Sequence, residues 1–449
     1  MNIHSNTFKT LRADYPDFIF EAYQWDIQSD GLHISFDFHI PTLTHFEPTL
    51  FLPQRPFYAF DRLSTEQMDT LVAHIGLIEL ISYWKSTCSP NIHIKPIALD
   101  KAAIQWWKKL YFNGLGEFFY TNNIKTTVDE FMNIRADGKP FSKFVLSLSD
   151  EVIIPVGGGK DSVVTLELLR DVALKPLPMI VNPRGASLNC AKIAGFKETE
   201  VIEVRRTLDK RLLALNAQGL LNGHTPFSAL LAFVTLLCAA ITGKKHIALS
   251  NESSANEATD PVTGVNHQYS KSVEFEIDFR NYVHTYINED IDYFSFLRPL
   301  NELTIAKYFA SFSAYHDVFR SCNVGSKDDM WCCHCAKCLF AYIILSPFIP
   351  PRSLQAIFGE NLLNNSSLQP EFEQLTGLRA VKPFECVGTV NEVCNALNLY
   401  IQRFNDNDSC LVQYFKTKPL YTLSPIDLTT EFSEHHCLSS QFLNYHHHE

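Results

Sequence analysis

The sequence lacks the apolar features of exported and membrane proteins. No uninterrupted apolar run reaches the roughly 18 residues that a membrane-spanning helix needs. The first residues, MNIHSNTFKTLRADYPDF, contain no apolar core of signal-peptide length. The most apolar segment, residues 229–241, is short and predicts a buried helix. We therefore expect a cytoplasmic protein without a membrane span.

A surplus of basic residues is also absent. The chain has 38 Lys and Arg against 49 Asp and Glu, a formal net charge of −11, which argues against a nucleic-acid partner. Repeats and low-complexity tracts are lacking too, and 46% of the residues are hydrophobic, as in ordinary globular proteins. The length of 449 residues is enough for two or three domains.

The first 145 residues predict an α+β N-terminal domain. Residues 32–40, LHISFDFHI, alternate between apolar and polar side chains, as in a strand with one buried face. A helix is expected from Ser64 to Trp84, with Ser64 as N-cap and Gln67 completing a capping box. A second helix is expected at residues 101–111.

Residues 146–350 predict an α/β domain, because short apolar runs alternate with helical segments. The expected strands lie at residues 152–156, 176–181, 199–204 and 246–250. This alternation is typical of a parallel sheet with helices on both faces, in which ligands bind beyond the carboxyl ends of the strands. The loops after Val156, Val181 and Ser250 should therefore line one site. Residues 351–449, from the Pro350-Pro351 boundary, are expected to form a small C-terminal extension that contributes to the site.

A glycine loop follows the first of these strands. Glycines allow a tight turn that brings backbone N–H groups close to an anion, and the helix N-terminus and Lys160 add positive charge. Asp161 after Lys160 excludes a Walker loop, and Ser162 excludes a dinucleotide fingerprint. The pattern S-G-G-x-D-S fits, with Gly157 in place of the first Ser, and it resembles the PP-loop ATP pyrophosphatases. A plain glycine turn is the alternative. The loop glycines are Gly157, Gly158 and Gly159.

Five of the 12 cysteines lie between residues 322 and 338. Four of them have the spacing Cys322-x9-Cys332-x2-Cys335-x2-Cys338, which suits a tetrahedral structural zinc site. Cys333 does not fit the spacing, and His334 is a possible substitute ligand. The alternative interpretation is a chance cluster of core cysteines without a metal. The layout after a PP-loop core resembles the zinc module of the 7-cyano-7-deazaguanine synthases. The cysteine spacing therefore predicts a region at residues 322–338 that bound zinc stabilises.

Taken together, the motifs resemble the UDP-N-acetylmuramoyl-L-alanyl-L-glutamate epimerase (MurL) family over most of the chain. The matching segments are ISYWK (81–85), WWKKLYFNGLGEFFY (106–120), VGGGKDS (156–162), NESSANE (251–257), HQYSKS (267–272), WCCHCAKC (331–338) and KPFECVGT (382–389). The resemblance implies an isomerase of peptidoglycan precursor synthesis. It would convert the terminal L-Glu of UDP-MurNAc-L-Ala-L-Glu to D-Glu through an acyl-adenylate, using ATP and Mg²⁺ and releasing AMP and pyrophosphate.

The resemblance also implies residue roles. The three loop glycines and Ser162 would hold phosphates, Lys160 would neutralise developing charge, and Asp161 would help to place Mg²⁺. The expected nucleotide, substrate or metal contacts elsewhere are Asn182, Arg184, Ser187, Glu252, Asn256 and Arg298. The candidates for proton transfer are His267, Tyr269, Glu385 and Cys386. The sequence does not choose among these four. It also does not say which carboxylate of glutamate is activated, although the α-carboxylate adjoins the proton to be lost.

Two other functions stay open at this point. One is a different PP-loop ATP pyrophosphatase, of the 7-cyano-7-deazaguanine synthase or tRNA-thiolating kind. The other is a non-catalytic nucleotide-binding regulator, because Gly157 removes one hydroxyl from the usual phosphate loop.

Overall fold

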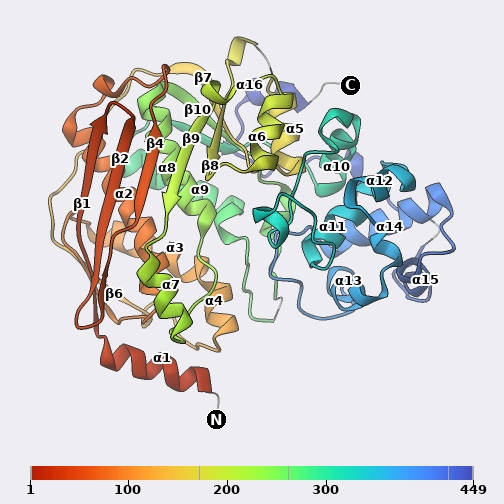
Figure 1. Cartoon of the computed structure of the whole chain (residues 1–449), viewed down its shortest axis with the longest axis horizontal. Helices are drawn as coiled ribbons and strands as arrows, with labels where there is room; N and C mark the ends of the chain where they lie inside the picture. Colours follow the sequence, from red (N-terminus) through yellow and green to blue (C-terminus); the bar gives the residue numbers. More distant parts are fainter. Residues whose placement is uncertain (1–2, 171, 261, 423, 447–449) are drawn as a thin grey trace. The chain divides into compact units, whose positions relative to one another are not determined.

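A computed structural model describes residues 3–170, 172–260, 262–422 and 424–446 of the chain (Figure 1). The chain divides into two compact units, and each is assembled from segments that are discontinuous in the sequence. Unit 1 comprises Met1–Ile153, Ile202–Ile247 and Tyr269–Tyr293, and unit 2 comprises Ile154–Val201, Ala248–Gln268 and Phe294–Glu449. The domain boundaries expected from the sequence at residues 145 and 350 stay a prediction.

Eleven strands among the described residues belong to a large mixed sheet. They are β1 (Asp17–Gln28), β2 (Gly31–Ile40), β3 (Thr44–Phe46), β4 (Thr49–Pro53), β5 (Asn91–Ile94), β6 (Asn133–Ala136), β7 (Ser149–Pro155), β8 (Leu177–Val181), β9 (Ile202–Thr207), β10 (Lys244–Leu249) and β11 (Asp292–Ser295). The predicted α/β class is confirmed. The strands β7 and β10 are parallel, as expected for residues 146–350. The strand β9 also pairs antiparallel with β4 of the N-terminal region, so parallel and antiparallel strands join in one mixed sheet.

Unit 1 contains a run of strands in the order β9-β4-β2-β1-β5-β6, with β3 beside β2. The strands β1 and β2 form an antiparallel hairpin that opens from the pair Gln28↔Gly31. Burial alternates along β2, as the period-two pattern of residues 32–40 predicts, so every second side chain enters the core. The helix α2 (Thr65–Trp84) packs on β1 and β2 (Figure 1).

Local capping fixes the start of α2 and the end of α8 in unit 1. The Ser64 hydroxyl accepts a hydrogen bond from the Gln67 backbone, and the Gln67 side chain closes the expected capping box. Gly243 ends α8 (Phe227–Thr242) in the left-handed region at φ 69°, which glycine adopts without strain. The other helices of this unit are α1 (Ile3–Asp14), α3 (Lys101–Gly114), α4 (Gly116–Thr121), α7 (Lys210–Ala217) and α9 (Val273–Tyr286).

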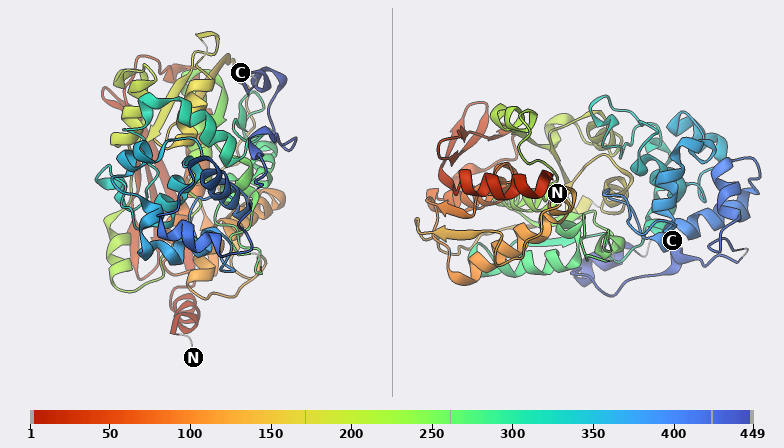
Figure 2. Two further views of the ribbon diagram at one scale, coloured as in Figure 1. Left: turned by 90° about the vertical axis from the view of Figure 1, so that its right-hand side faces the viewer. Right: turned by 90° about the horizontal axis from the view of Figure 1, so that it is seen from below.

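Unit 2 contains β8 and the helices that follow the ends of the central strands. Its helices are α5 (Lys160–Leu168), α6 (Gly185–Ile193), α10 (Glu302–Ser311), α11 (Ala336–Leu345), α12 (Pro351–Phe358), α13 (Gln369–Leu375), α14 (Val390–Phe404), α15 (Cys410–Lys416) and α16 (Ser440–Leu443). The helix α11 is largely buried because α12, α13 and α14 pack around it (Figure 2). Over the described ranges, no helix combines the length and hydropathy that a membrane crossing requires.

Candidate active site

The glycine loop connects β7 to α5 within unit 2. The Val156 N–H donates to Met179 O at 2.8 Å, so the loop leaves the sheet next to the end of β8. Gly158 has φ +88°, and a Cβ there would lie 2.7 Å from the Ser187 nitrogen at the start of α6. A Cβ on Gly157 would meet nothing within 4 Å. The backbone at Gly157 therefore borders open space, as a phosphate-binding loop requires.

Lys160 lies buried at the start of α5, with a side chain that is only 5% exposed. Its ammonium donates to Asp161 Oδ1 at 2.5 Å and to Glu302 Oε2. Burial alone would lower the pKa of Lys160, but the carboxylates of Asp161 and Glu302 raise it above its ordinary value. Lys160 therefore stays a cation, and the Asp161 side chain, 29% exposed, is the more accessible of its two carboxylate partners.

Two buried acids that the sequence reading missed join this cluster. Glu302, at the first position of α10, donates its backbone N–H to Glu392 Oε1 at 2.7 Å. Burial raises the pKa of Glu302 above its ordinary value, the Lys160 ammonium opposes the increase, and Asp161, Glu252 and Glu392 add to it. Burial also raises the pKa of Glu392. The sequence signals at these positions are Asn301 before Glu302 and the capping pattern T-V-N-E at Thr389 to Glu392, which indicate helix starts and not a buried charge cluster.

The loop after β8 brings the predicted residues Asn182, Arg184 and Ser187 to the start of α6. Asn182 has φ 49°, and Ser187 Oγ accepts from the Arg184 N–H at 3.1 Å. The Arg184 guanidinium donates to Ser326 Oγ at 2.5 Å. Asp329, which the sequence reading missed, accepts from the Ala186 N–H at 2.7 Å, so a carboxylate already satisfies one N–H at this helix start.

The loop after β10 carries Glu252 and Asn256, and Arg298 follows β11; all three residues belong to unit 2. Arg298 is fully buried and donates to Glu252 O at 2.6 Å and to Ser295 Oγ at 3.1 Å. The Asn256 side chain donates to Ser253 O at 3.0 Å. Arg298 therefore fixes the backbone that carries Glu252, and its predicted phosphate contact stays a prediction.

The segment KPFECVGT, residues 382–389, packs against this same loop. The Lys382 ammonium pairs with Glu257, and the Lys382 N–H donates to Thr259 O at 3.1 Å. The Gln268 amide donates to Val387 O at 3.2 Å. Two segments that the sequence reading singled out separately are therefore neighbours in space.

Three of the four candidates for proton transfer lie in this part of unit 2. Asn323 donates to Glu385 Oε2 at 2.6 Å, and burial raises the pKa of Glu385, while the charges of Lys337 and His267 oppose the increase. The Cys386 carbonyl accepts from the Lys337 ammonium. Tyr269 lies in unit 1, where burial raises its pKa to about 12 and it hydrogen-bonds with Asn113.

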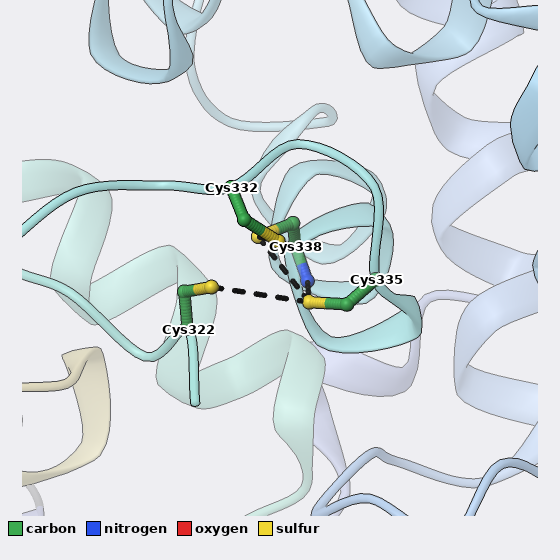
Figure 3. A group of neighbouring side chains, drawn as sticks. All are labelled: Cys322, Cys332, Cys335 and Cys338. Atoms are coloured by element: carbon green, nitrogen blue, oxygen red, sulfur yellow. Dashed lines mark hydrogen bonds between the residues drawn. The ribbon is translucent and has the colours of Figure 1, made fainter. Parts of the chain in front are cut away.

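The four spaced cysteines meet at the start of α11 (Figure 3). Their sulfurs all lie within 4.8 Å of one another, with Sγ–Sγ distances of 3.9 Å for Cys322 to Cys335, 3.7 Å for Cys332 to Cys338 and 3.5 Å for Cys335 to Cys338. A tetrahedral site with Zn–S bonds of about 2.3 Å has sulfur–sulfur edges of about 3.8 Å. The hydrogen bond between Cys338 and Cys335 lowers the pKa of Cys335 and raises that of Cys338, and metal binding needs all four as thiolates.

The geometry also distinguishes the four candidate zinc ligands from Cys333 and His334, which are adjacent in the sequence. Cys333 lies outside the group and its thiol donates to Phe358 O at 3.3 Å. His334 is not a member of the group either. The spacing of the four cysteines therefore predicted the set that the fold brings together, and the donor set fits a zinc ion.

Comparison with known families gives a match to almost the whole chain. Residues 9–296 match the model of the MurL N-terminal domain, and residues 318–423 match that of the MurL C-terminal domain. The chain belongs to the MurL family. The resemblance inferred from the sequence motifs is thereby confirmed.

Three curated relatives in this family carry the name UDP-N-acetyl-alpha-D-muramoyl-L-alanyl-L-glutamate epimerase. The protein from Xanthomonas oryzae pv. oryzae is 32% identical over 391 residues, covering 85% of this chain and 86% of that protein. The relative from Micromonospora sp. is 34% identical and covers 77% of this chain and 79% of its own. The relative from Salinispora tropica is 34% identical and covers 78% of each. No solved structure matches the chain significantly.

Proposed function

We propose that this protein converts the terminal L-Glu of UDP-MurNAc-L-Ala-L-Glu to D-Glu, at the expense of ATP, in peptidoglycan precursor synthesis. The observation that carries the proposal is similarity along most of the chain to relatives named for this epimerase. The glycine loop, with its open space at Gly157 and its buried cation Lys160, supports a PP-loop type of nucleotide site.

The chemistry explains why an epimerase would use ATP. The α-proton of glutamate is hard to remove while the neighbouring carboxylate is charged, because the carbanion would place a second negative charge beside it. In the transfer of AMP, an oxygen of the α-carboxylate forms a bond to the α-phosphorus of ATP, and the bond from that phosphorus to the α,β-bridging oxygen breaks, which releases pyrophosphate. The resulting acyl-adenylate has no carboxylate charge and withdraws electrons, so a positioned base can remove the proton. Reprotonation on the other face and hydrolysis give the D-epimer and AMP.

The loop residues take the roles that charge and placement favour. Backbone N–H groups at residues 157–159 and the Ser162 hydroxyl would bind phosphate oxygens, and Lys160 would offset their charge. Asp161 would hold a magnesium ion, which supplies further charge neutralisation when bound. Asn182, Arg184 and Ser187 would flank the nucleotide, as would Arg298. Glu252 and Asn256 would contact the substrate or the magnesium ion.

For proton transfer we favour His267 and Glu385 over Tyr269. His267 and Glu385 interact electrostatically, and both lie where the loop after β10 packs on residues 382–389. Tyr269 belongs to unit 1 and its hydroxyl hydrogen-bonds with Asn113. Cys386 is the remaining candidate. The four-cysteine group would hold a structural zinc, because four thiolates leave no open coordination position for catalysis.

The direct test incubates the purified protein with ATP, Mg²⁺ and UDP-MurNAc-L-Ala-L-Glu, followed by chiral analysis of glutamate and measurement of AMP. We expect D-Glu and substrate-dependent AMP. The absence of both would refute the proposal, and AMP without D-Glu would indicate a different PP-loop ATP pyrophosphatase.

Replacing Asp161 with Asn tests the glycine loop. The amide keeps the size of the side chain but removes a charged ligand for the magnesium ion, so we expect AMP release to fall by at least about a hundredfold. Asp150→Asn, an exposed aspartate in unit 1, is the control and should behave like the wild type. Full retention of AMP release by Asp161→Asn would remove the loop from the mechanism.

A further inference from the structure

Two carboxylates pair with the Lys160 ammonium, and one of them is much more accessible to solvent than the other. The Asp161 side chain is 29% exposed, and the Glu302 side chain is 2% exposed. A bound nucleotide or metal ion can therefore approach Asp161 directly. Glu302 is covered and touches the ammonium of Lys160 from the protein interior.

Glu302 is itself held by two other groups in unit 2. It is the first residue of α10, where Asn301 forms the N-cap by accepting from the Thr304 N–H at 2.9 Å. Its own N–H donates to Glu392 Oε1, and Glu392 Oε2 accepts from the Thr389 N–H at 2.6 Å. A continuous set of hydrogen bonds thus connects Lys160 to α10 and to the start of α14.

This arrangement is costly for a purely structural purpose. A buried carboxylate loses its hydration, and an apolar side chain of similar volume often gives equal or greater stability. Among the described residues, the charges that act most strongly on Glu302 are the cation Lys160 and the acids Asp161, Glu252 and Glu392. The same surroundings raise the pKa of Glu302.

We propose that Glu302 is a positioning residue that holds the Lys160 ammonium at the glycine loop. This rests on the proposed function of that loop. Of the two carboxylates that contact the Lys160 ammonium in the described part of the chain, loss of Glu302 would leave Asp161, which is also the proposed magnesium ligand. Glu302 therefore gives the Lys160 ammonium a second, buried carboxylate partner, which keeps it at the loop when Asp161 binds the metal.

A double-mutant cycle between Lys160 and Glu302 tests the proposal on the full-length protein. The variants are Lys160→Met, Glu302→Ala, Glu302→Gln and the double variant Lys160→Met with Glu302→Ala, measured as kcat and as KM for ATP. We expect Glu302→Ala to lower kcat/KM by at least about tenfold, since a charge-assisted hydrogen bond is lost. Glu302→Gln keeps an acceptor oxygen and should lose less. The double variant should be no slower than Lys160→Met alone.

A control variant distinguishes positioning from folding. Glu79, 1% exposed and paired with Arg206 in unit 1, is an equally buried acid outside the site. Glu79→Gln should lower the thermal unfolding midpoint without changing KM for ATP. If Glu302→Ala does not fold, Glu302→Gln replaces it in the double-mutant cycle with Lys160→Met.

Two results would overturn the proposal. One is a rate within about twofold of wild type for Glu302→Ala. The other is a loss in the double variant equal to the product of the two single losses, which would mean that Glu302 acts independently of Lys160. If the wild type forms no D-Glu, the proposed function fails. The double-mutant cycle can then be measured as the ATP affinity of each variant by calorimetry. Additive losses of affinity would then refute the positioning role separately.

Discussion

His74 shows how a single polar residue is accommodated in the core of unit 1. The ring is 3% exposed, and its Nδ1 lies 2.6 Å from Thr70 O while its Nε2 lies 3.2 Å from the Tyr282 hydroxyl. The indole N–H of Trp107 donates to the same hydroxyl at 2.9 Å. A neutral ring with its proton on Nδ1 satisfies this whole chain of hydrogen bonds. Protonation would place an uncompensated cation in the core, and burial lowers the pKa of His74 to about 4.

This depressed pKa predicts a loss of stability in mild acid. Above the unfolded value of about 6.5, both states are neutral and the stability is fully present. As pH falls towards 4, the unfolded chain binds a proton that the folded chain refuses, so stability declines by up to about 3 kcal/mol. Urea unfolding at pH 7 and pH 4.5 measures the change. His74→Phe should lose less than wild type over this interval, and equal losses would contradict a neutral buried His74.

Among the residues of the site, the sequence indicated the cation Lys160 but not the buried acids near it. Lys160 and Asp161 follow a glycine run, and that pattern has a known use at phosphate sites. Glu302 and Glu392 look like ordinary acids in the first turn of a helix, where the helix dipole already favours them. Their burial depends on how α10 and α14 pack, and local sequence does not carry that information.

Among the elements, the glycine loop offers a matched pair of substitutions. Gly157 has no neighbour within 4 Å of an added Cβ, so Gly157→Ser should fold normally and keep AMP release within a few-fold of wild type. Gly158 has φ +88°, where a side chain is strained, and an added Cβ would lie 2.7 Å from the Ser187 nitrogen. Gly158→Ala should therefore lower AMP release by at least about tenfold. Equal activity of the two variants would show that the loop geometry does not matter for the reaction.

Periodicity and capping predicted most elements but not their partners. The capped helix α2, the alternating strand β2 and the strand–helix alternation after residue 146 were all confirmed. The sequence did not indicate that the antiparallel N-terminal strands and the later parallel strands form one sheet, which they do because β4 pairs with β9 through residues 49–51 and 205–207. More than 150 residues separate these strands, and neither strand's pattern indicates which neighbour it takes.

At the scale of the molecule, the four-cysteine group is expected to stabilise unit 2 through bound zinc. The purified protein should contain about one zinc per chain, and a strong chelator should lower its thermal unfolding midpoint. Cys335→Ser removes a ligand and should lose the metal. Cys333→Ser, a buried neighbour outside the group, should retain it. Metal analysis and calorimetry measure both, and a zinc-free but equally stable wild type would contradict the assignment.

The interleaving of the two units has a consequence for how the protein is made. Unit 1 needs residues up to Tyr293, and unit 2 begins at Ile154 but needs segments after that point. A ribosome adds about 5–20 residues per second, so the first strands wait many seconds for β9 and α9 to emerge. During that time the edge of β4 has no partner from β9. The nascent chain therefore exposes apolar strand surface for longer than a protein built from consecutive domains would.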